Sequence, residues 1–291
     1  MSPNARGAMC MIGAMTAFTV NDALMKSLAG SLPLAQAVFL RGLLTTGLML
    51  ALALALRQFT LRVPRRDRFL IACRTCAEVT TAFFFLTALY NMHIANVSAI
   101  MQSLPLTVSL AGVVFLGQTI GRRRLAAILA GFIGVLLIVR PGAEGFTIYS
   151  LYVLAAVACV TVRDILSRKI SQDVPSLLIA LNNAIWVTVA FGVTSIWSEW
   201  APVDFVSGLT LVGASLTVIV AYFLAVVSMR VGDIAAIAPF RYTSLLVAIV
   251  LGVVLFDERP DFLTLLGASM VVGTGLFTLW RESRLAAAGT G

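Results

Sequence analysis

Charged side chains interrupt several long apolar segments of this sequence. Asp22 and Lys26 lie four residues apart in one segment, and Arg74 and Glu78 have the same spacing in another. Side chains four residues apart lie on one face of a helix, so each pair could form an internal ion pair. Charges are costly in hydrocarbon and are usually paired, exposed to a watery cavity or functional. The pattern therefore indicates a pathway for a solute.

The composition places these charges in a membrane protein. Of the 291 residues, 60% are hydrophobic and only 12% are charged, which leaves too little polar surface for a soluble globule. A membrane-spanning helix needs about 20 apolar residues. We therefore predict an all-α integral membrane protein with ten transmembrane helices, near 7–29, 34–56, 68–90, 93–117, 122–140, 147–170, 175–197, 206–229, 232–256 and 261–281.

The basic residues predict the orientation of these helices. When alternate loops are assigned to opposite sides, fourteen lysines and arginines fall on one side, and only Arg140 and Arg259 fall on the other. Cytoplasmic loops carry the excess of Lys and Arg. We expect a multi-pass protein of the cytoplasmic (inner) membrane with both termini in the cytoplasm. The net charge of +8 is then a topology signal and not a sign of a nucleic-acid partner.

The sequence also repeats itself. Asp22 and Lys26 recur 142 residues later as Asp164 and Arg168, so an acid and the following base keep their register. A second match relates residues 99–118 to residues 236–258 if about three residues are inserted. Chance similarity between apolar segments is the alternative explanation.

The two matches predict two repeats, at residues 1–142 and 143–291, with five spans each. Because five is an odd number, the second repeat must enter the membrane in the opposite direction. Such inverted repeats are the arrangement that many transporters use for alternating access.

The repeated charges are candidate gate or coupling residues. With the predicted topology, Asp22 and Lys26 lie toward the external end of the first span. Arg163, Asp164 and Arg168 lie toward the cytoplasmic end of the sixth. These groups could be matching outer and inner gate elements. Alternatively, Lys26 and Arg168 only anchor helix ends by extending to the membrane interface.

Three charges, on Arg41, Glu78 and Arg241, are expected seven or more residues inside their spans. Over the whole set, positive charges exceed negative ones by two: Lys26, Arg41, Arg74, Arg163 and Arg241 stand against Asp22, Glu78 and Asp164. Arg41 and Arg241 have no partner nearby in the sequence. Either one of them reaches Glu78 across the bundle, or together they hold an anionic group of the substrate.

Two prolines occupy equivalent places, Pro105 in the fourth span and Pro239 in the ninth. Proline removes a backbone donor, and a membrane helix tolerates it where another group or a cavity satisfies the backbone. We expect helix kinks that line a cavity, although purely structural kinks are the alternative. Polar side chains nearby complete the candidate substrate-binding set, which comprises Arg241, Arg41, Glu78, Arg74, Gln102, Asn96 and Tyr242.

The sequence offers no pattern for a metal or cofactor. The four cysteines lie within apolar spans, where ordinary packing is the simplest role. Cys73 and Cys76 have redox-motif spacing without the preceding strand that such a motif needs. His93 is the only histidine in the chain. We therefore expect neither a metal site nor a cofactor.

Several motifs in order resemble the drug/metabolite transporter superfamily, EamA type. They are Asn21-Asp22 with Lys26, the segment 39–42 (Phe-Leu-Arg-Gly), the segment 238–242 (Ala-Pro-Phe-Arg-Tyr) and the segment 255–261. The resemblance covers essentially the whole chain and is similar in detail to the S-adenosylmethionine uptake branch. It implies paired five-helix repeats and transport of small metabolites. Gln118 departs from the glutamate that this family usually carries there, which puts a symmetric role of Glu258 in doubt.

These observations predict a secondary transporter that works by alternating access. The resemblance implies a small polar or amphipathic substrate, such as an amino-acid-like, S-adenosylmethionine-like or riboflavin-like metabolite. A membrane-embedded enzyme acting on a lipid or small metabolite is the alternative, but no Ser-His or His-Asp arrangement is present. The expected partners are the substrate, the lipid bilayer and a coupling proton, and the expected assembly is a monomer or weak dimer.

Overall fold

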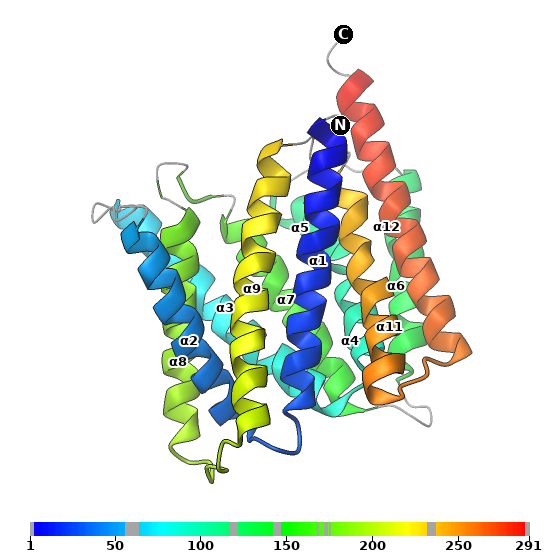
Figure 1. The fold of residues 1–291 in the computed structure, drawn as a ribbon. Helices are drawn as coiled ribbons and strands as arrows, with labels where there is room; N and C mark the ends of the chain where they lie inside the picture. The colour runs from blue at the N-terminus through cyan, green and yellow to red at the C-terminus, as the bar shows by residue number, and fades with distance from the viewer. Residues whose placement is uncertain are drawn as a thin grey trace.

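Every regular element in the described part of the chain is a helix (Figure 1). The computed structural model describes all residues except 1–2, 56–63, 117–121, 142–146, 168, 172–173, 175, 232–236 and 289–291. The expected repeat boundary at 142–143 and Arg168 therefore lie outside the described residues. The helices are α1 (Pro3–Ser27), α2 (Leu34–Ala55), α3 (Arg65–Asn91), α4 (Ile94–Met101), α5 (Leu104–Leu116), α6 (Arg122–Val139), α7 (Ile148–Ser167), α8 (Ser176–Ser195), α9 (Phe205–Val231), the 3₁₀ helix η1 (Ala238–Tyr242), α11 (Thr243–Phe256) and α12 (Phe262–Ala288).

The lengths of these helices fit a bilayer. Eight segments are long and apolar enough to cross a membrane, and shorter apolar helices at Leu125–Val139 and Phe262–Thr278 fill the fifth and tenth places. Since nothing in the hydrocarbon region can hydrogen-bond an exposed backbone, helices that satisfy their own backbone groups are the structure such a sequence can adopt. The expected all-α membrane fold with ten spans is confirmed.

The fourth and ninth spans are interrupted, but differently from the expected mid-span kinks. Between α4 and α5 the helix breaks at Gln102 and Ser103, and Pro105 is the second residue of α5. Pro239 is the second residue of η1, which leads into α11. The N–H groups in the first turn of a helix have no partner within that helix, so a proline there loses no helical hydrogen bond. Both prolines therefore stand at the start of a helical segment and do not kink a continuous helix.

Helix packing follows a pseudo-two-fold pattern. Helix α1, in the first span, packs on α9, in the eighth, and α7, in the sixth, packs on α3, in the third. If each span is replaced by the span five places away in the chain, the α1–α9 contact becomes the α7–α3 contact. The contacts α2–α8, α6–α12 and α4–α11 each map onto themselves under this exchange. The arrangement of two inverted five-helix repeats is thus visible in the packing.

One hydrogen bond marks the axis of this pseudosymmetry. The hydroxyl oxygens of Thr46 on α2 and Thr188 on α8 lie 3.3 Å apart, and these residues are 142 positions apart in the sequence. That separation equals the repeat offset between Asp22 and Asp164. Two equivalent residues can touch only where the axis passes between them, so the axis crosses the α2–α8 contact.

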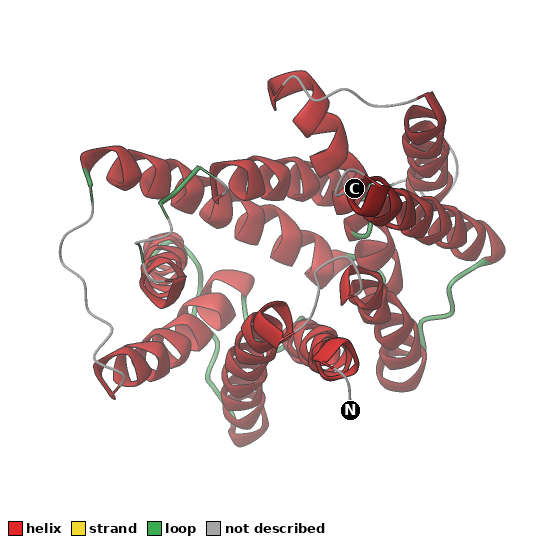
Figure 2. Cartoon of the chain, turned by 90° about the horizontal axis from the view of Figure 1, so that it is seen from above, coloured by secondary structure: helices red, strands yellow, loops and turns green. Residues whose placement is uncertain are grey.

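Helices α6 and α12 stand together at one side of the bundle (Figures 1 and 2). They cross closely at Gly134 and Gly267, where a Cβ on Gly267 would lie 2.5 Å from the Gly134 carbonyl oxygen. Small residues allow such close approach of helices in lipid. Both chain termini lie at the same end of the bundle (Figure 1).

Candidate functional site

A buried ion pair closes the end of the bundle opposite the termini. The Lys26 ammonium lies 3.0 Å from Glu258 Oε1, and the two side chains are only 10% and 8% exposed. Lys26 is the next-to-last residue of α1, whereas Glu258 lies in the link between α11 and α12. We call this pair the Lys26–Glu258 latch. The expected pairing of Lys26 with Asp22 is wrong, because the tip of the long lysine side chain reaches past the end of its own helix.

The two residues of the latch also form hydrogen bonds with the turn between α3 and α4. Lys26 donates to the carbonyl of Leu89, at 3.2 Å, and to that of Met92. Glu258 Oε2 accepts from the backbone N–H of Ile94 at 2.8 Å. The cation thus meets free carbonyls at the end of one helix and the anion meets a free N–H at the start of the next, which is the favourable arrangement for both helix dipoles.

A second polar group surrounds Arg41 on α2. Arg41 Nη1 donates to Asn21 Oδ1 at 3.0 Å, and Asn21 Nδ2 donates to Asp22 Oδ1 at 3.0 Å. Arg41 also interacts electrostatically with Asp22 itself and with Tyr90. Its Nε is buried and has no hydrogen-bond partner. Arg41 therefore does not pair with Glu78, and one of its donors remains available.

A third group joins α3 to α7. Arg163 lies 3.2 Å from Glu78 and 2.9 Å from Asp164, so one cation serves two carboxylates. Arg74 donates from Nε to Ser167 Oγ at 2.7 Å, while its buried Nη1 has no partner. The expected hydrogen-bonded pair of Arg74 with Glu78 is not formed. Because α3 packs directly on α7, the side chains of α7 offer closer partners than the next turn of α3 does.

One aromatic residue that the sequence reasoning did not single out, Tyr222, lies on α9 beside α1. Its ring packs edge to face on the ring of Phe18, with 5.2 Å between the ring centroids. Tyr222 is the one polar residue of the apolar run 218–227, and that is the signal a reading of the sequence could have used.

Arg241 lies in η1, two residues after Pro239. Its side chain is exposed. Residues 232–236 lie outside the described residues, so the expected depth of Arg241 inside the ninth span stays a prediction.

The polar residues near the interruptions form their own cluster. Gln102 Nε2 donates to Ser244 Oγ at 2.5 Å, which ties the break in the fourth span to the start of α11. The buried Asn96 Oδ1 and the Tyr242 hydroxyl have no hydrogen-bond partner. Tyr242 packs against Gly275 of α12, where a Cβ would collide with its hydroxyl.

Among the described residues of these groups the charges balance. Lys26, Arg41, Arg74 and Arg163 stand against Asp22, Glu78, Asp164 and Glu258. This balance differs from the surplus of two positive charges expected from the sequence, because the buried Glu258 belongs to these groups and Arg241 is not counted among them. The arrangement suits a solute that carries both signs of charge better than a simple anion.

The fold and these polar groups define a class: a multi-pass membrane transporter built from two inverted repeats. A family model described as the EamA-like transporter family matches residues 5–140 and 147–280. The chain belongs to this family.

Relatives of this chain are named as transporters of different solutes. The chain is 30% identical over 208 residues to the S-adenosylmethionine uptake transporter of Rickettsia conorii, covering 69% of this chain and 70% of the relative. It is 26% identical over 246 residues to the riboflavin transporter of Brucella anthropi (81% and 85% covered). It is 24% identical over 277 residues to the pseudopaline exporter of Pseudomonas aeruginosa (91% and 93% covered). A solved structure, 20% identical, has the same fold with a TM-score of 0.66 over 97% of this chain and 99% of that one.

Proposed function

We propose that this protein carries a small zwitterionic metabolite across the cytoplasmic membrane by alternating access, with both termini in the cytoplasm. The observation that carries the proposal is the meeting of charged side chains from both repeats inside the bundle, where Arg163 of the second repeat lies 3.2 Å from Glu78 of the first. In a lipid-spanning bundle, such groups mark a solute path. Transporters of this architecture bind their solutes near the bilayer midplane, where the repeats meet.

The free donors of the site favour a substrate carboxylate. Arg41 Nε and Arg74 Nη1 are both buried without a partner, and an unmet buried donor costs about 1–3 kcal/mol. A carboxylate that accepts from such a donor would remove this cost when it binds. Asp22 and Asp164 can then serve the cationic end of the same molecule. Of the solutes in the relatives' names, S-adenosylmethionine carries such an amino-acid end.

The Lys26–Glu258 latch is the proposed gate at the external end. It connects α1, the α3–α4 turn and the α11–α12 link, so it must open before a solute can pass that end. The inverted counterpart of the latch would be formed by Arg168 and Gln118, both outside the described residues. Alternating access requires that one end is closed while the other is open.

Coupling to a proton is part of the proposal, with Asp22 or Asp164 as the group that takes it up. An enzymatic role receives less support, because the family and the relatives of this chain are described as transporters. We also propose that the protein works as a monomer or weak dimer in the lipid bilayer, without a nucleic-acid partner.

Uptake by proteoliposomes tests this function. Labelled S-adenosylmethionine, riboflavin and amino acids should be offered with and without a proton gradient. We expect Arg41→Gln to reduce uptake of the transported solute at least about ten-fold, the equivalent of losing one charge-assisted hydrogen bond. Arg66→Gln, which alters an exposed arginine at the start of α3, should leave uptake unchanged. Equal uptake by wild type and Arg41→Gln would refute the proposed site.

A further inference from the structure

The ammonium group of Lys26 is held by four groups of the protein. Its Nζ lies 3.0 Å from Glu258 Oε1 and 3.2 Å from the carbonyl oxygen of Leu89, and it also donates to the carbonyl oxygen of Met92. The same nitrogen lies over the ring of Phe256, 5.5 Å from the ring centroid. Three oxygens match the three N–H donors of a primary ammonium, and an aromatic face attracts its charge. We call these four groups the ammonium cage.

A cleft of about 430 Å³ lies beside the ammonium cage. The residues that line it come from the ends of α1, α3 and α11 and from the turn after α1: Lys26, Ser27, Ala29, Tyr90, Leu255 and Phe256. The Tyr90 hydroxyl is buried and has no hydrogen-bond partner. Sites of this volume hold small organic molecules. A solute in this space, which we call the latch cleft, therefore lies next to the Lys26 ammonium.

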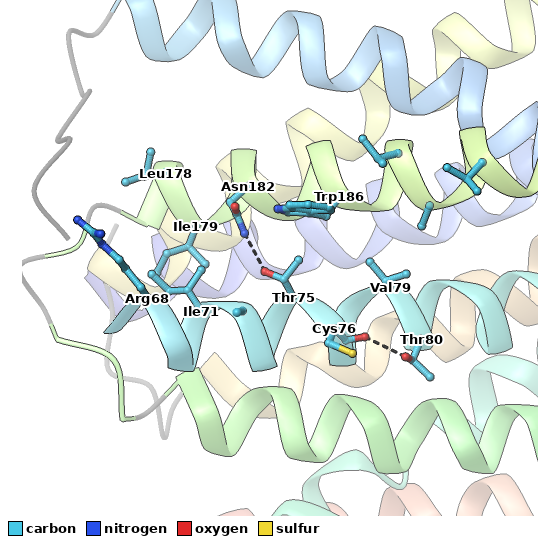
Figure 3. A pocket seen from close by; sticks show the side chains of 14 residues that line it. Arg68, Ile71, Thr75, Cys76, Val79, Thr80, Leu178, Ile179, Asn182 and Trp186 are labelled. Carbon is cyan, nitrogen blue, oxygen red and sulfur yellow. Dashed lines mark hydrogen bonds between the residues drawn. The ribbon is translucent and has the colours of Figure 1, made fainter. Parts of the chain in front are cut away.

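A larger pocket, of about 850 Å³, lies between α3 and α8 and lacks these features (Figure 3). None of the described residues that line it is acidic. The Asn182 amide in its wall already donates to the Thr75 hydroxyl at 2.8 Å. Of these two spaces, the latch cleft is the one that favours a charged amine.

Exchange of one ammonium for another is the least costly way to open the latch. If Lys26 simply left, Glu258 would remain a carboxylate without its cation, and its side chain is only 8% exposed. Removing one partner from a buried ion pair is strongly destabilising. A second ammonium in place of Nζ keeps Glu258 paired. The long lysine side chain can then move into the latch cleft, which it already lines.

An ammonium that enters here has a second carboxylate ahead of it. Asp22 lies four residues before Lys26 on α1, about 6 Å further into the bundle at 1.5 Å per residue. In the first repeat the counterpart of Glu258 is the neutral Gln118. An amide carries no charge to pair with an ammonium, so this kind of exchange belongs to the latch.

We propose that the ammonium cage is the entry site for the amino group of the transported solute, and that this group opens the latch by replacing the Lys26 ammonium. The inference rests on the proposed function and names the substrate class, a solute with a free primary amino group. The rest of the solute lies in the latch cleft against Tyr90 and Phe256. Because a short tether gives Lys26 an effective concentration of roughly millimolar order, these further contacts are needed for a dilute solute to compete.

Binding of n-butylammonium to Lys26→Ala tests the cage. This substitution removes the tethered ammonium and keeps the four groups around it. We expect millimolar n-butylammonium to raise the Tm of the full chain in detergent, whereas n-butanol, without the charge, and tetramethylammonium, without N–H donors, should not. Adding Glu258→Gln should weaken the binding at least about ten-fold, the equivalent of one charge-assisted hydrogen bond. No rise in Tm, or the same response in both variants, would overturn the proposal.

A labelling experiment tests the exchange in a chain that keeps Lys26, so it decides the matter even if Lys26→Ala does not fold. The four native cysteines are replaced by serine, and a cysteine replaces Ala29 in the latch cleft. Its reaction with the anionic reagent methanethiosulfonate ethylsulfonate is timed. We expect n-butylammonium to raise the rate toward that of the Glu258→Gln chain.

Two variants control this labelling. Glu258→Gln should be insensitive to n-butylammonium, because its cage has lost the carboxylate. Asp261→Asn, which breaks the exposed pair with Arg140 in the same region, should respond as the chain with Asp261 does. An unchanged rate with n-butylammonium, or an acceleration that Glu258→Gln keeps, would overturn the proposal.

Failure of the proposed function would look different from failure of this inference. Both measurements report binding of an amine to the full chain and need no uptake. If proteoliposomes take up a zwitterionic solute but neither measurement responds to n-butylammonium, the entry site is refuted and the transport function stands. If both respond but none of the offered solutes is taken up, the transport function is refuted.

Discussion

The two ionic clusters that join different spans stabilise the bundle in different ways. In the Lys26–Glu258 latch, one cation and one anion meet each other and also cap the ends of α3 and α4. In the Arg163 cluster, one arginine serves two carboxylates along the sides of α3 and α7, and side chains alone make the contacts. The latch therefore depends on where helices end, whereas the Arg163 cluster depends on how two helices pack.

This difference suggests different roles. A contact between helix ends can be released by a small movement of a link, whereas a contact along packed helices is lost only if the helices separate. Sequence adds a second asymmetry, because the counterpart of Glu258 is the neutral Gln118. The equivalent sequence position of the first repeat therefore offers no carboxylate for an ion pair of the latch type.

The largest effect is expected from Arg163→Gln. This change leaves Glu78 and Asp164 without their cation, and breaking a buried pair in this way costs about 3–5 kcal/mol. Thermal unfolding in detergent should show a strongly lowered Tm. Adding Glu78→Gln and Asp164→Asn should recover most of the loss. A wild-type Tm for Arg163→Gln alone would show that the cluster does not hold α3 to α7.

A smaller effect on stability but a clear effect on opening is expected from Glu258→Gln. The amide oxygen can still accept from Ile94, so the cost is about 1–3 kcal/mol and falls mainly on the closed state. The opening can be measured with a cysteine in place of Tyr90, which lines the cleft beside Lys26. In the Glu258→Gln protein this cysteine should react with a membrane-impermeant maleimide roughly ten-fold faster than in the protein that keeps Glu258.

The matched counterpart of this variant is Gln118→Glu, which adds the missing carboxylate at the opposite end. It should speed the same labelling reaction, because closure at its own end favours the state in which the latch is open. Slower labelling in Gln118→Glu than in the protein that keeps Gln118 would contradict the alternation of the two ends.

The smallest effect is expected at the exposed pair Arg140–Asp261, in the same region as the latch but outside the spans. The hydrogen bond from Arg140 holds the pKa of the Asp261 carboxyl well below its usual range. A lowered folded-state pKa contributes stability above the unfolded pKa, about 3.9, and this contribution is lost as the pH falls through the folded value.

Because the Asp261 side chain is 51% exposed, Asp261→Asn should cost only about 0.2–1 kcal/mol at pH 7. The difference in Tm between wild type and variant should narrow as the pH is lowered from 5 to 3. A difference that grows over this range would show that the pair does not stabilise the folded state.

The sequence was sufficient for the fold because the signals were local. Apolar segment length predicted the spans, and the recurrence of Asp22 as Asp164 predicted the inverted repeats. Partners of the charges were harder to predict, since they depend on packing between distant segments. Lys26 pairs with Glu258 and not with Asp22, and Glu78 pairs with Arg163 and not with Arg74. The depth of Arg241 stays a prediction, because residues 232–236 lie outside the described residues.

The central claim is that the Lys26–Glu258 latch must open for transport. It is tested most directly by placing cysteines at both positions in a chain whose four native cysteines are replaced by serine. A short, reducible bis-thiosulfonate then bridges the pair, and uptake into proteoliposomes is measured. The account predicts that the bridge stops uptake, leaves substrate-induced thermal stabilisation in place, and is reversed by reduction. Uptake at the unbridged rate with the bridge intact would contradict it.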